Sequence, residues 1–208
     1  MSNPWEDISL DSYEKHMSLD SVKQLQTLNL LMKRQLQSYP VTSAMILGVA
    51  RGNGLEHISL DKYSKVYGVD INSDYLDAVK MRYKNLEGTL ECVKADIINE
   101  ADKLPSAQLV IADLFIEYVG YDAFTAAVLQ TSAEYVSCVI QINLDSRQWV
   151  SDSPYLHEFD GLDEVHHQMD EASLIAAMTG VGYSHILSEK EPLPNGKCLV
   201  RVDFKRRS

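Results

Sequence analysis

An α/β fold built on a doubly wound, mostly parallel sheet is predicted for this chain by three observations. Apolar strand-like segments alternate with amphipathic helix-like segments, a pattern that gives parallel strands with helices on both faces. A glycine-rich turn at 48–54 follows the first predicted strand. The last two predicted strands are joined by 192–196, whose Asn-Gly pair is a hairpin signal, so one antiparallel strand should enter the sheet.

The first third of the sequence predicts a helix and then two strands on either side of the glycine-rich turn. Apolar side chains recur at helical spacing over 19–39, and Pro40 ends this helix. Residues 1–17 are polar with isolated aromatic side chains, and no clear period is present there. The elements expected next are a strand at 45–49, a short helix at 55–61 and a strand at 66–70.

The later elements continue the alternation. The expected helices are 74–86, capped by Asn72 or Ser73, then 121–132 and 170–179. The expected strands are 90–95, 107–112, 136–142, 183–190 and 197–205. Between them lies 145–168, a long polar segment with several aromatic residues, and connections of that length are usually functional or mobile.

Composition and charge narrow the class of protein. The 208 residues suit one domain, and 45% hydrophobic with 24% charged residues is typical of a soluble globular protein. The formal net charge of −11, with one basic run at 205–207, argues against extended nucleic-acid binding. The three cysteines are odd in number and widely separated, which predicts neither a disulfide framework nor a zinc site. With no secretory pattern and no membrane-spanning stretch, a cytoplasmic protein without membrane association is expected.

The glycine-rich turn and Asp70 together predict a nucleoside-binding crevice. Glycines allow backbone amides to approach a ligand closely. Asp70 ends the neighbouring strand, where its carboxylate can accept hydrogen bonds from both hydroxyls of a ribose. A dinucleotide dehydrogenase is disfavoured, because its fingerprint needs a small residue where this sequence has His57 or, in the other register, Asn53.

At this point the chain resembles the class I S-adenosylmethionine-dependent methyltransferases. The resemblance rests on 47–54, 68–71, 94–97, 109–113 and the closing hairpin, and it covers about residues 41–206. It implies a seven-stranded sheet in the order 3-2-1-4-5-7-6 with strand 7 antiparallel. It also implies a division into an N-terminal lid segment and helix at 1–40 and a methyltransferase domain at 41–208.

The resemblance also assigns a binding site for S-adenosylmethionine. The turn residues Gly48, Val49, Ala50, Gly52 and Gly54 would surround the methionine and ribose portion. Asp70 would take the ribose hydroxyls, Ile71, Asp96 and Ile97 would contact the adenine, and Asp113 and Leu114 would lie near the methionine end. Each of the two acids could instead have a local role, Asp70 at a helix N-terminus and Asp96 in a turn.

Two positions depart from the family pattern. Gly48 stands where the family usually has an acid that helps to hold the methionine amino group, so that contact is in doubt. Ala50 stands where the family has its first glycine. An alanine is tolerable at that position if its backbone φ stays below zero.

Residues that could carry the chemistry are harder to identify. Methyl transfer depends mainly on placement of the acceptor, and a base is needed only when the acceptor must lose a proton. Glu117 and Tyr118 are candidates for orienting the acceptor or taking its proton, against the alternative of an exposed acid and a locally packed ring. Tyr13, His16 and Met17 could form a lid, against the alternative of ordinary helix packing.

The segment 145–168 allows two further interpretations. Its aromatic and imidazole side chains could shape an acceptor pocket; they are Trp149, Tyr155, His157 and Phe159. A metal site is not expected, because the spacing of His157, Asp160, Asp163, His166 and His167 matches no ligand pattern.

The sequence as a whole predicts methyl transfer to a small-molecule acceptor. Protein methylation is one alternative, because the aromatic segment 145–168 could clamp a peptide. A silent module that binds S-adenosylmethionine is another, because the turn is unusual. The acceptor and the oligomeric state are not specified by the sequence.

Overall fold

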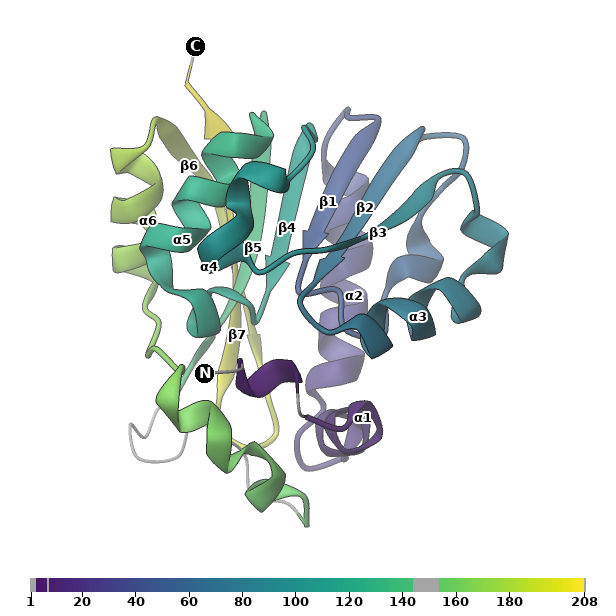
Figure 1. The fold of residues 1–208 in the computed structure, drawn as a ribbon. Coiled ribbons are helices and arrows are strands. Elements are labelled where there is room, and N and C mark those ends of the chain that lie inside the picture. Colours follow the sequence, from purple (N-terminus) through teal and green to yellow (C-terminus); the bar gives the residue numbers. More distant parts are fainter. Residues whose placement is uncertain (1–2, 7, 144–153, 208) are drawn as a thin grey trace.

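The computed structural model describes residues 3–6, 8–143 and 154–207, and its centre is a seven-stranded sheet in the order β3-β2-β1-β4-β5-β7-β6 (Figure 1). The strands are β1 (Ser43–Leu47), β2 (Lys65–Asp70), β3 (Leu90–Lys94), β4 (Leu109–Asp113), β5 (Tyr135–Ile142), β6 (Tyr183–Pro192) and β7 (Cys198–Arg206). Strands β1 to β5 pair in parallel, and β7 runs antiparallel to both β5 and β6. The predicted fold class and strand order are therefore confirmed.

Helices cover both faces of the sheet (Figure 1). On one face lie α2 (Gln24–Ser38) and α3 (Ser73–Arg82), and on the other lie α4 (Ile97–Glu100), α5 (Ile116–Thr131) and α6 (Glu171–Gly180). Each face of the sheet has its own hydrophobic core. Leu36 of α2 and Val79 of α3 pack in the core on one face, and Phe124 of α5 and Leu174 of α6 pack in the core on the other. Burial on both faces explains why the central strands are nearly continuous apolar runs.

The N-terminal segment differs from the expectation. Helix α1 (Leu10–Ser18) lies in a region with no clear helical period, and a single 3₁₀ turn, η1, precedes it at Pro4–Glu6. The helix predicted over 19–39 starts only at Gln24, because Lys23 adopts a left-handed backbone with φ of 53°. Helix α1 escaped detection because it buries little of its own surface: among its residues only His16 and Met17 are buried.

Two later segments also differ from the expectation. Helix α5 begins at Ile116 rather than near 121, and Gly120 kinks it with φ of 75° and ψ of 169°. Residues Leu156–Glu164 form a 3₁₀ helix, η5, inside the segment expected to be a long loop. Trp149 of that segment lies outside the described residues. The other 3₁₀ turns are η2 (Leu55–His57), η3 (Lys84–Leu86) and η4 (Ala101–Lys103).

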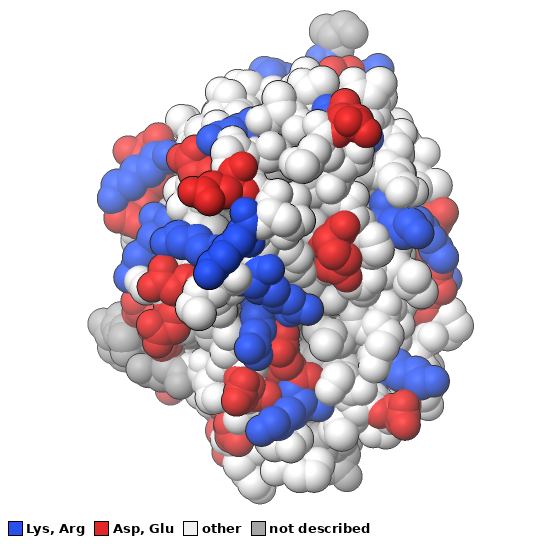
Figure 2. Space-filling view, turned by 90° about the vertical axis from the view of Figure 1, so that its right-hand side faces the viewer, with Lys and Arg blue, Asp and Glu red and all other residues white. Residues whose placement is uncertain are grey.

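The surface on the side of α3 and β3 carries charges of both signs in close mixture (Figure 2). Ion pairs such as Lys80–Asp77 and Lys65–Glu91 bring opposite charges together. On this face the Lys and Arg side chains are bordered by Asp and Glu side chains. Within 3–6, 8–143 and 154–207, no helix has both the length and the apolar character that crossing a bilayer requires.

Candidate functional site

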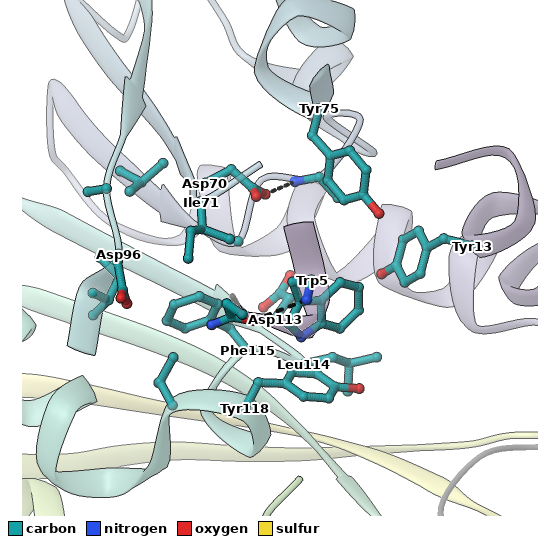
Figure 3. A pocket seen from close by; sticks show the side chains of 17 residues that line it. Trp5, Tyr13, Asp70, Ile71, Tyr75, Asp96, Asp113, Leu114, Phe115 and Tyr118 are labelled. Carbon is teal, nitrogen blue, oxygen red and sulfur yellow. Dashed lines mark hydrogen bonds between the residues drawn. The ribbon is translucent and has the colours of Figure 1, made fainter. Parts of the chain in front are cut away.

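A cavity opens at the carboxyl ends of the parallel strands (Figure 3). It lies between β1 and β4, because the chain turns to one face of the sheet after β1 and to the other face after β4. This is the place where open α/β sheets bind ligands. The space measures about 690 Å³ with its open mouth included, and we call it the first cavity. It is lined by these residues expected from the sequence: Tyr13, Gly48, Ala50, Asp70, Ile71, Asp96, Ile97, Asp113, Leu114 and Tyr118.

Asp70 is fixed by backbone donors from two different loops. Its Oδ2 accepts from the Ala50 N–H at 2.9 Å, and its Oδ1 accepts from the Asn72 N–H at 2.9 Å. Burial raises the pKa of this carboxyl, and these N–H donors oppose the rise. Each oxygen retains a further lone pair, so a carboxylate held in this way can accept from two neighbouring hydroxyls.

The backbone of the glycine-rich turn explains why its residues are small. Gly48 has φ of 68°, and a Cβ there would lie 2.6 Å from the ring of Phe115. Ala50 has φ of 46°, so the negative φ that the sequence analysis required of an alanine here is not found. In this left-handed conformation the Ala50 N–H points at Asp70 and donates to its carboxylate. An alanine can occupy this conformation at a cost of about 1 kcal/mol.

Three of the predicted turn residues do not line the first cavity. A Cβ on Gly52 would meet Leu55 at 2.7 Å and Tyr83 at 2.8 Å, and one on Gly54 would meet Met32 at 2.6 Å. These glycines allow the turn to pack closely against its own 3₁₀ helix and against α2. Val49 borders a neighbouring hollow and covers Gly68 of β2.

Asp96 combines a place at the cavity with a structural role. It is the N-cap of α4: its Oδ1 accepts from the Ile98 N–H at 3.0 Å, and its Oδ2 accepts from the Asn99 side chain at 2.6 Å. Ile97 beside it is buried and presents an apolar surface. The pair can therefore provide an apolar contact and one acceptor edge to a flat ring.

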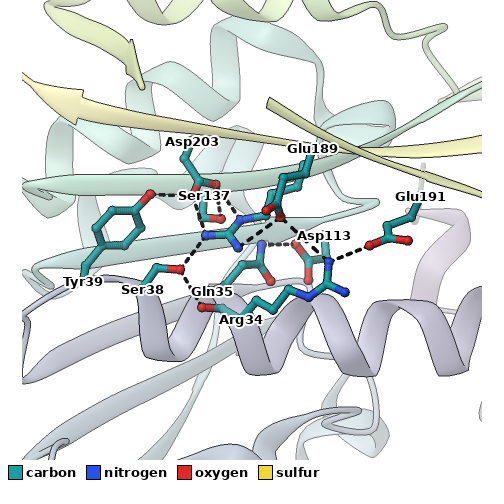
Figure 4. Close-up of polar contacts among 10 residues, drawn as sticks. Arg34, Gln35, Ser38, Tyr39, Asp113, Ser137, Glu189, Glu191 and Asp203 are labelled. Atoms are coloured by element: carbon teal, nitrogen blue, oxygen red, sulfur yellow. Dashed lines mark hydrogen bonds and ion pairs between the residues drawn. The ribbon is translucent and has the colours of Figure 1, made fainter. Parts of the chain in front are cut away.

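Asp113 ends β4 and reaches Gln35, a residue that is 0% exposed on α2 (Figure 4). Its Oδ1 accepts from Gln35 Nε2 at 2.8 Å. Among the described residues, no donor reaches Asp113 Oδ2 or Gln35 Oε1, although both atoms are buried. Burial raises the pKa of the Asp113 carboxyl to about 7, against the opposing effects of Gln35 and Arg201. Of the two residues, Asp113 lines the first cavity, where a buried acceptor without a donor suits a ligand that brings an N–H donor.

A second cavity adjoins the first and shares four of its lining residues, Trp5, Tyr13, Leu114 and Tyr118. It measures about 600 Å³ with its mouth included. Its other lining residues are His16, Met17, Gln24, Glu117, Gln141, Asn143, Phe159, Leu162 and His166. The predicted catalytic and lid residues therefore gather here, beside the expected cofactor site.

Glu117 lies in the first turn of α5 and is only 4% exposed. Its Oε1 accepts from the Gln141 N–H at 3.2 Å, while no donor in the described part of the chain reaches its buried Oε2. Burial raises the pKa of Glu117 to about 7, because the two backbone N–H groups near the carboxyl, its own and that of Gln141, compensate the lost hydration incompletely. Such a carboxyl can exchange a proton near neutral pH.

Both imidazoles of the second cavity are biased toward the neutral form. Burial lowers the pKa of His166 to about 4, with smaller effects from His167 and Lys197. Burial, assisted by Lys197, also lowers the pKa of His16. The His16 ring lies 5.0 Å from that of Phe159, so this wall is aromatic in character.

The N-terminal segment covers both cavities and is attached to the glycine-rich turn. Arg51 Nη1 lies 2.8 Å from Glu14 Oε2 of α1. Tyr75 donates its hydroxyl to the Ile8 carbonyl at 2.8 Å. Trp5 of η1 packs edge-on against Tyr118 with 4.8 Å between ring centroids, and Tyr13 packs against Trp5 at 5.7 Å. The three rings form a common boundary between the cavities.

Sequence reasoning missed several lining residues. Trp5 and Tyr75 border the first cavity, and so does Phe115, while Gln35 supports Asp113 from α2. A large aromatic residue in a polar N-terminal segment was the available signal for Trp5. Nothing in the sequence distinguishes Gln35 from the other polar residues of its helix.

Of the described residues after β5, only some contribute to the cavities. Phe159 and His166 line the second cavity, whereas the side chain of His157 is 91% exposed and pairs with Asp160 at 3.4 Å. In the described part of the chain, no three His, Cys, Asp or Glu residues are grouped in a way that could hold a metal ion.

No protein-family model matches the sequence, and no curated protein gives a significant match. Solved structures share the fold. The N-methyltransferase NodS from Bradyrhizobium japonicum, in complex with S-adenosyl-L-homocysteine, is 14% identical, with a TM-score of 0.65 and coverage of 100% of both chains. Magnesium protoporphyrin IX methyltransferase ChlM from Synechocystis PCC 6803, with bound S-adenosylhomocysteine, is 10% identical, with a TM-score of 0.63 over 95% of this chain and 94% of that chain.

The cyclase SpnF is 8% identical, with a TM-score of 0.67 over 89% of this chain and 82% of that chain. Identities this low establish the architecture, and the residues of this chain must carry any statement about its chemistry. With the strand order and the cavity at the carboxyl ends of its parallel strands, this chain has the Rossmann-like fold of the class I S-adenosylmethionine-dependent methyltransferases.

Proposed function

We propose that this protein is a methyltransferase that uses S-adenosylmethionine to methylate a small-molecule acceptor. The observation that carries the proposal is the pair of adjoining cavities at the carboxyl ends of the parallel strands. The first cavity is lined by an acid from β2, an acid from β4 and an apolar wall at Ile97. The second cavity provides a separate place for an acceptor, with a buried carboxyl in its wall.

The residues of the first cavity fit the parts of the proposed methyl donor. Asp70 can accept from the ribose hydroxyls, and Ile71 and Ile97 can contact the adenine. Asp113 can replace the missing acid at Gly48, because its Oδ2, which no donor in the described part of the chain reaches, can accept from the methionine ammonium group. Phe115 occupies the space that a side chain at position 48 would need.

The bound sulfonium supplies an electrophilic methyl group, so the chain itself has to position the acceptor and keep water away. Leu114, which has an unusual φ of 51°, lies between the two cavities with Tyr13 and Tyr118. We propose that residues 1–40 act as a lid through Trp5 and Tyr13, and that Glu117 receives a proton from the acceptor.

Binding of two related nucleosides tests the cofactor assignment. S-adenosylhomocysteine carries the amino-acid portion, whereas 5′-methylthioadenosine lacks it. In Asp113→Asn, calorimetry should show about a tenfold loss of affinity for S-adenosylhomocysteine, the effect of losing one charge-assisted hydrogen bond, and no change for 5′-methylthioadenosine. In Asp70→Asn, both nucleosides should bind more weakly. Equal losses for both nucleosides in Asp113→Asn contradict the role of Asp113, and binding of NAD in preference to either contradicts the assignment of the site.

Methyl transfer itself is tested with S-adenosylmethionine labelled in its methyl group. The protein is incubated with a cell extract, which is then fractionated by size. Label in the small-molecule fraction is the expected result. Label confined to protein favours the alternative of protein methylation, and binding without transfer into any fraction favours a silent binding module.

A further inference from the structure

The second cavity contains a carboxylate that no cationic side chain in the described part of its wall neutralises. Glu117 is 4% exposed, and its Oε2 has no hydrogen-bond partner in the described part of the chain. No lysine or arginine is among the described residues that line this cavity. A buried carboxylate oxygen without a donor is costly, and in a native protein it calls for an explanation such as a catalytic role or a bound ligand.

The other titratable groups in and near the described wall of this cavity do not supply the missing positive charge. His16 of α1 and His166 beyond η5 are both held toward the neutral form by burial. Lys197 influences both imidazoles but does not line the cavity, and burial lowers its own pKa to about 8. Tyr13 and Tyr118 stay protonated, because burial raises their pKa values further. The cavity is therefore neutral or negative around Glu117 at pH 7.

Aromatic rings surround the same space. Trp5, Tyr13, Tyr118 and Phe159 all contribute to its wall, and Trp5 packs edge-on against both tyrosines. Ring faces attract cations, and the attraction increases when water is excluded. An aromatic enclosure with one carboxylate suits a cationic group.

Resting on the proposed function, we infer that the acceptor is an amine whose protonated nitrogen binds to Glu117 Oε2 inside the aromatic wall of the second cavity, so that the protein is an N-methyltransferase. A carboxylate acceptor would be repelled by Glu117. An alcohol is too weak an acid to give its proton to a carboxylate, whereas an ammonium group in a desolvated site is a stronger acid than in water.

The transfer step balances with these residues alone. The ammonium group gives one proton to Glu117 Oε2, which leaves a neutral amine with its lone pair. That lone pair forms the new N–C bond to the methyl carbon as the C–S bond breaks, and the electrons of the C–S bond remain on sulfur as a lone pair. The methylated amine leaves protonated, and Glu117 returns its proton to solvent.

The test compares matched amines and alcohols that differ only in the group facing Glu117. The probes are benzylamine with benzyl alcohol, and phenethylamine with 2-phenylethanol. Calorimetry is done on protein saturated with S-adenosylhomocysteine. Each amine should bind at least about tenfold more tightly than its alcohol, as expected for a charge-assisted hydrogen bond within an aromatic wall.

Variants then assign the preference to one residue. Glu117→Gln should lower amine affinity about tenfold or more and leave alcohol affinity within about twofold, because only the amine uses the charge. Glu164→Gln, which changes an exposed acid of η5, is the matched control and should behave as wild type. With labelled S-adenosylmethionine, transfer to the amines should fall about 100-fold or more in Glu117→Gln, the usual effect of losing a general base.

Two results would overturn the inference. One is a wild-type protein that binds or methylates the amines no better than the alcohols. The other is an equal loss for amine and alcohol in Glu117→Gln with its affinity for S-adenosylhomocysteine intact. If wild-type protein binds no S-adenosylhomocysteine, the proposed function fails first, and the same calorimetry identifies that case separately.

Discussion

Three buried carboxylates differ in how many hydrogen-bond donors they receive: Asp203 receives several, whereas Asp113 and Glu117 receive few. Asp203 is 0% exposed and accepts from Arg201, Tyr39 and Ser137, with Arg201 Nε at 3.0 Å (Figure 4). Asp113 accepts from the Gln35 side chain and Glu117 from the Gln141 backbone, and each carboxylate keeps one buried oxygen that no donor in the described part of the chain reaches. Side chains of the protein provide hydrogen-bond donors to Asp203. Asp113 and Glu117 lie at cavity walls, and each has this one oxygen without a donor from the described residues.

This difference in hydrogen-bond partners distinguishes a carboxylate that stabilises the fold from carboxylates that can bind a ligand. A buried charge with all its partners holds β7, β5 and the end of α2 in register, and it has nothing to offer a ligand. A buried charge without partners destabilises the empty protein and is useful only when a ligand supplies the missing donors. Three experiments test this comparison.

The largest effect is expected from Asp203→Ala. This change leaves Arg201, which is 2% exposed, buried without its main partner. The free energy of unfolding should fall by about 3–5 kcal/mol, as measured by urea denaturation. Asp113→Asn is the comparison, since it removes a buried charge that had no ionic partner and should lose much less. A loss below about 1 kcal/mol in Asp203→Ala would show that the Arg201 network is not a stability element.

An intermediate effect is expected from pH. Burial raises the pKa values of Asp113 and Glu117 to about 7 in the folded protein, whereas the unfolded chain has ordinary values near 3.8 and 4.5. The folded state therefore binds more protons between about pH 4 and 7, and its stability should decrease as pH rises through this range. The melting temperature of wild type should fall across it, and that of the double variant Asp113→Asn, Glu117→Gln should fall less. A parallel fall in both proteins would place the titrating groups elsewhere.

The smallest effect is expected at the glycine-rich turn. Ala50→Gly removes a side chain from a residue with φ of 46°. Relief of the left-handed strain is offset by the greater freedom of glycine in the unfolded chain, so stability should change by less than about 1 kcal/mol. Affinity for S-adenosylhomocysteine should stay close to that of wild type, because the Ala50 N–H that Asp70 accepts is retained. A large loss of affinity would mean that the Ala50 methyl group itself contacts the ligand.

Much of the fold could be predicted from the sequence because its signals are local. Continuous apolar runs marked the central strands, and Asn72 marked the start of α3, where its side chain accepts from the Asp74 and Tyr75 N–H groups. The Asn-Gly pair before Lys197 marked the hairpin. Helix α1 was missed because it is short and buries few residues, so its period is weak.

The candidate site was only partly predictable, because its contacts join distant segments. The position of Asp70 at a strand end was readable in the chain, since strand ends and glycine turns are sequence features. Its donor Ala50, however, depends on a positive φ that the sequence argued against. Gln35 reaches Asp113, and Trp5 reaches Tyr118, across distances in sequence that no local pattern encodes.

The seven strands, most of the long helices, the acids at strand ends and the small residues of the turn were readable in the sequence, because backbone conformation and apolar periodicity are local properties. Tertiary structure alone decided which buried carboxylates are paired. Asp203 meets Arg201, Tyr39 and Ser137 only when β7 lies beside β5 and under α2, while Asp113 and Glu117 face cavities in the same arrangement. All three carboxylates lose water on burial. The packing of the surrounding elements determines which of them receives hydrogen bonds from protein groups in its place.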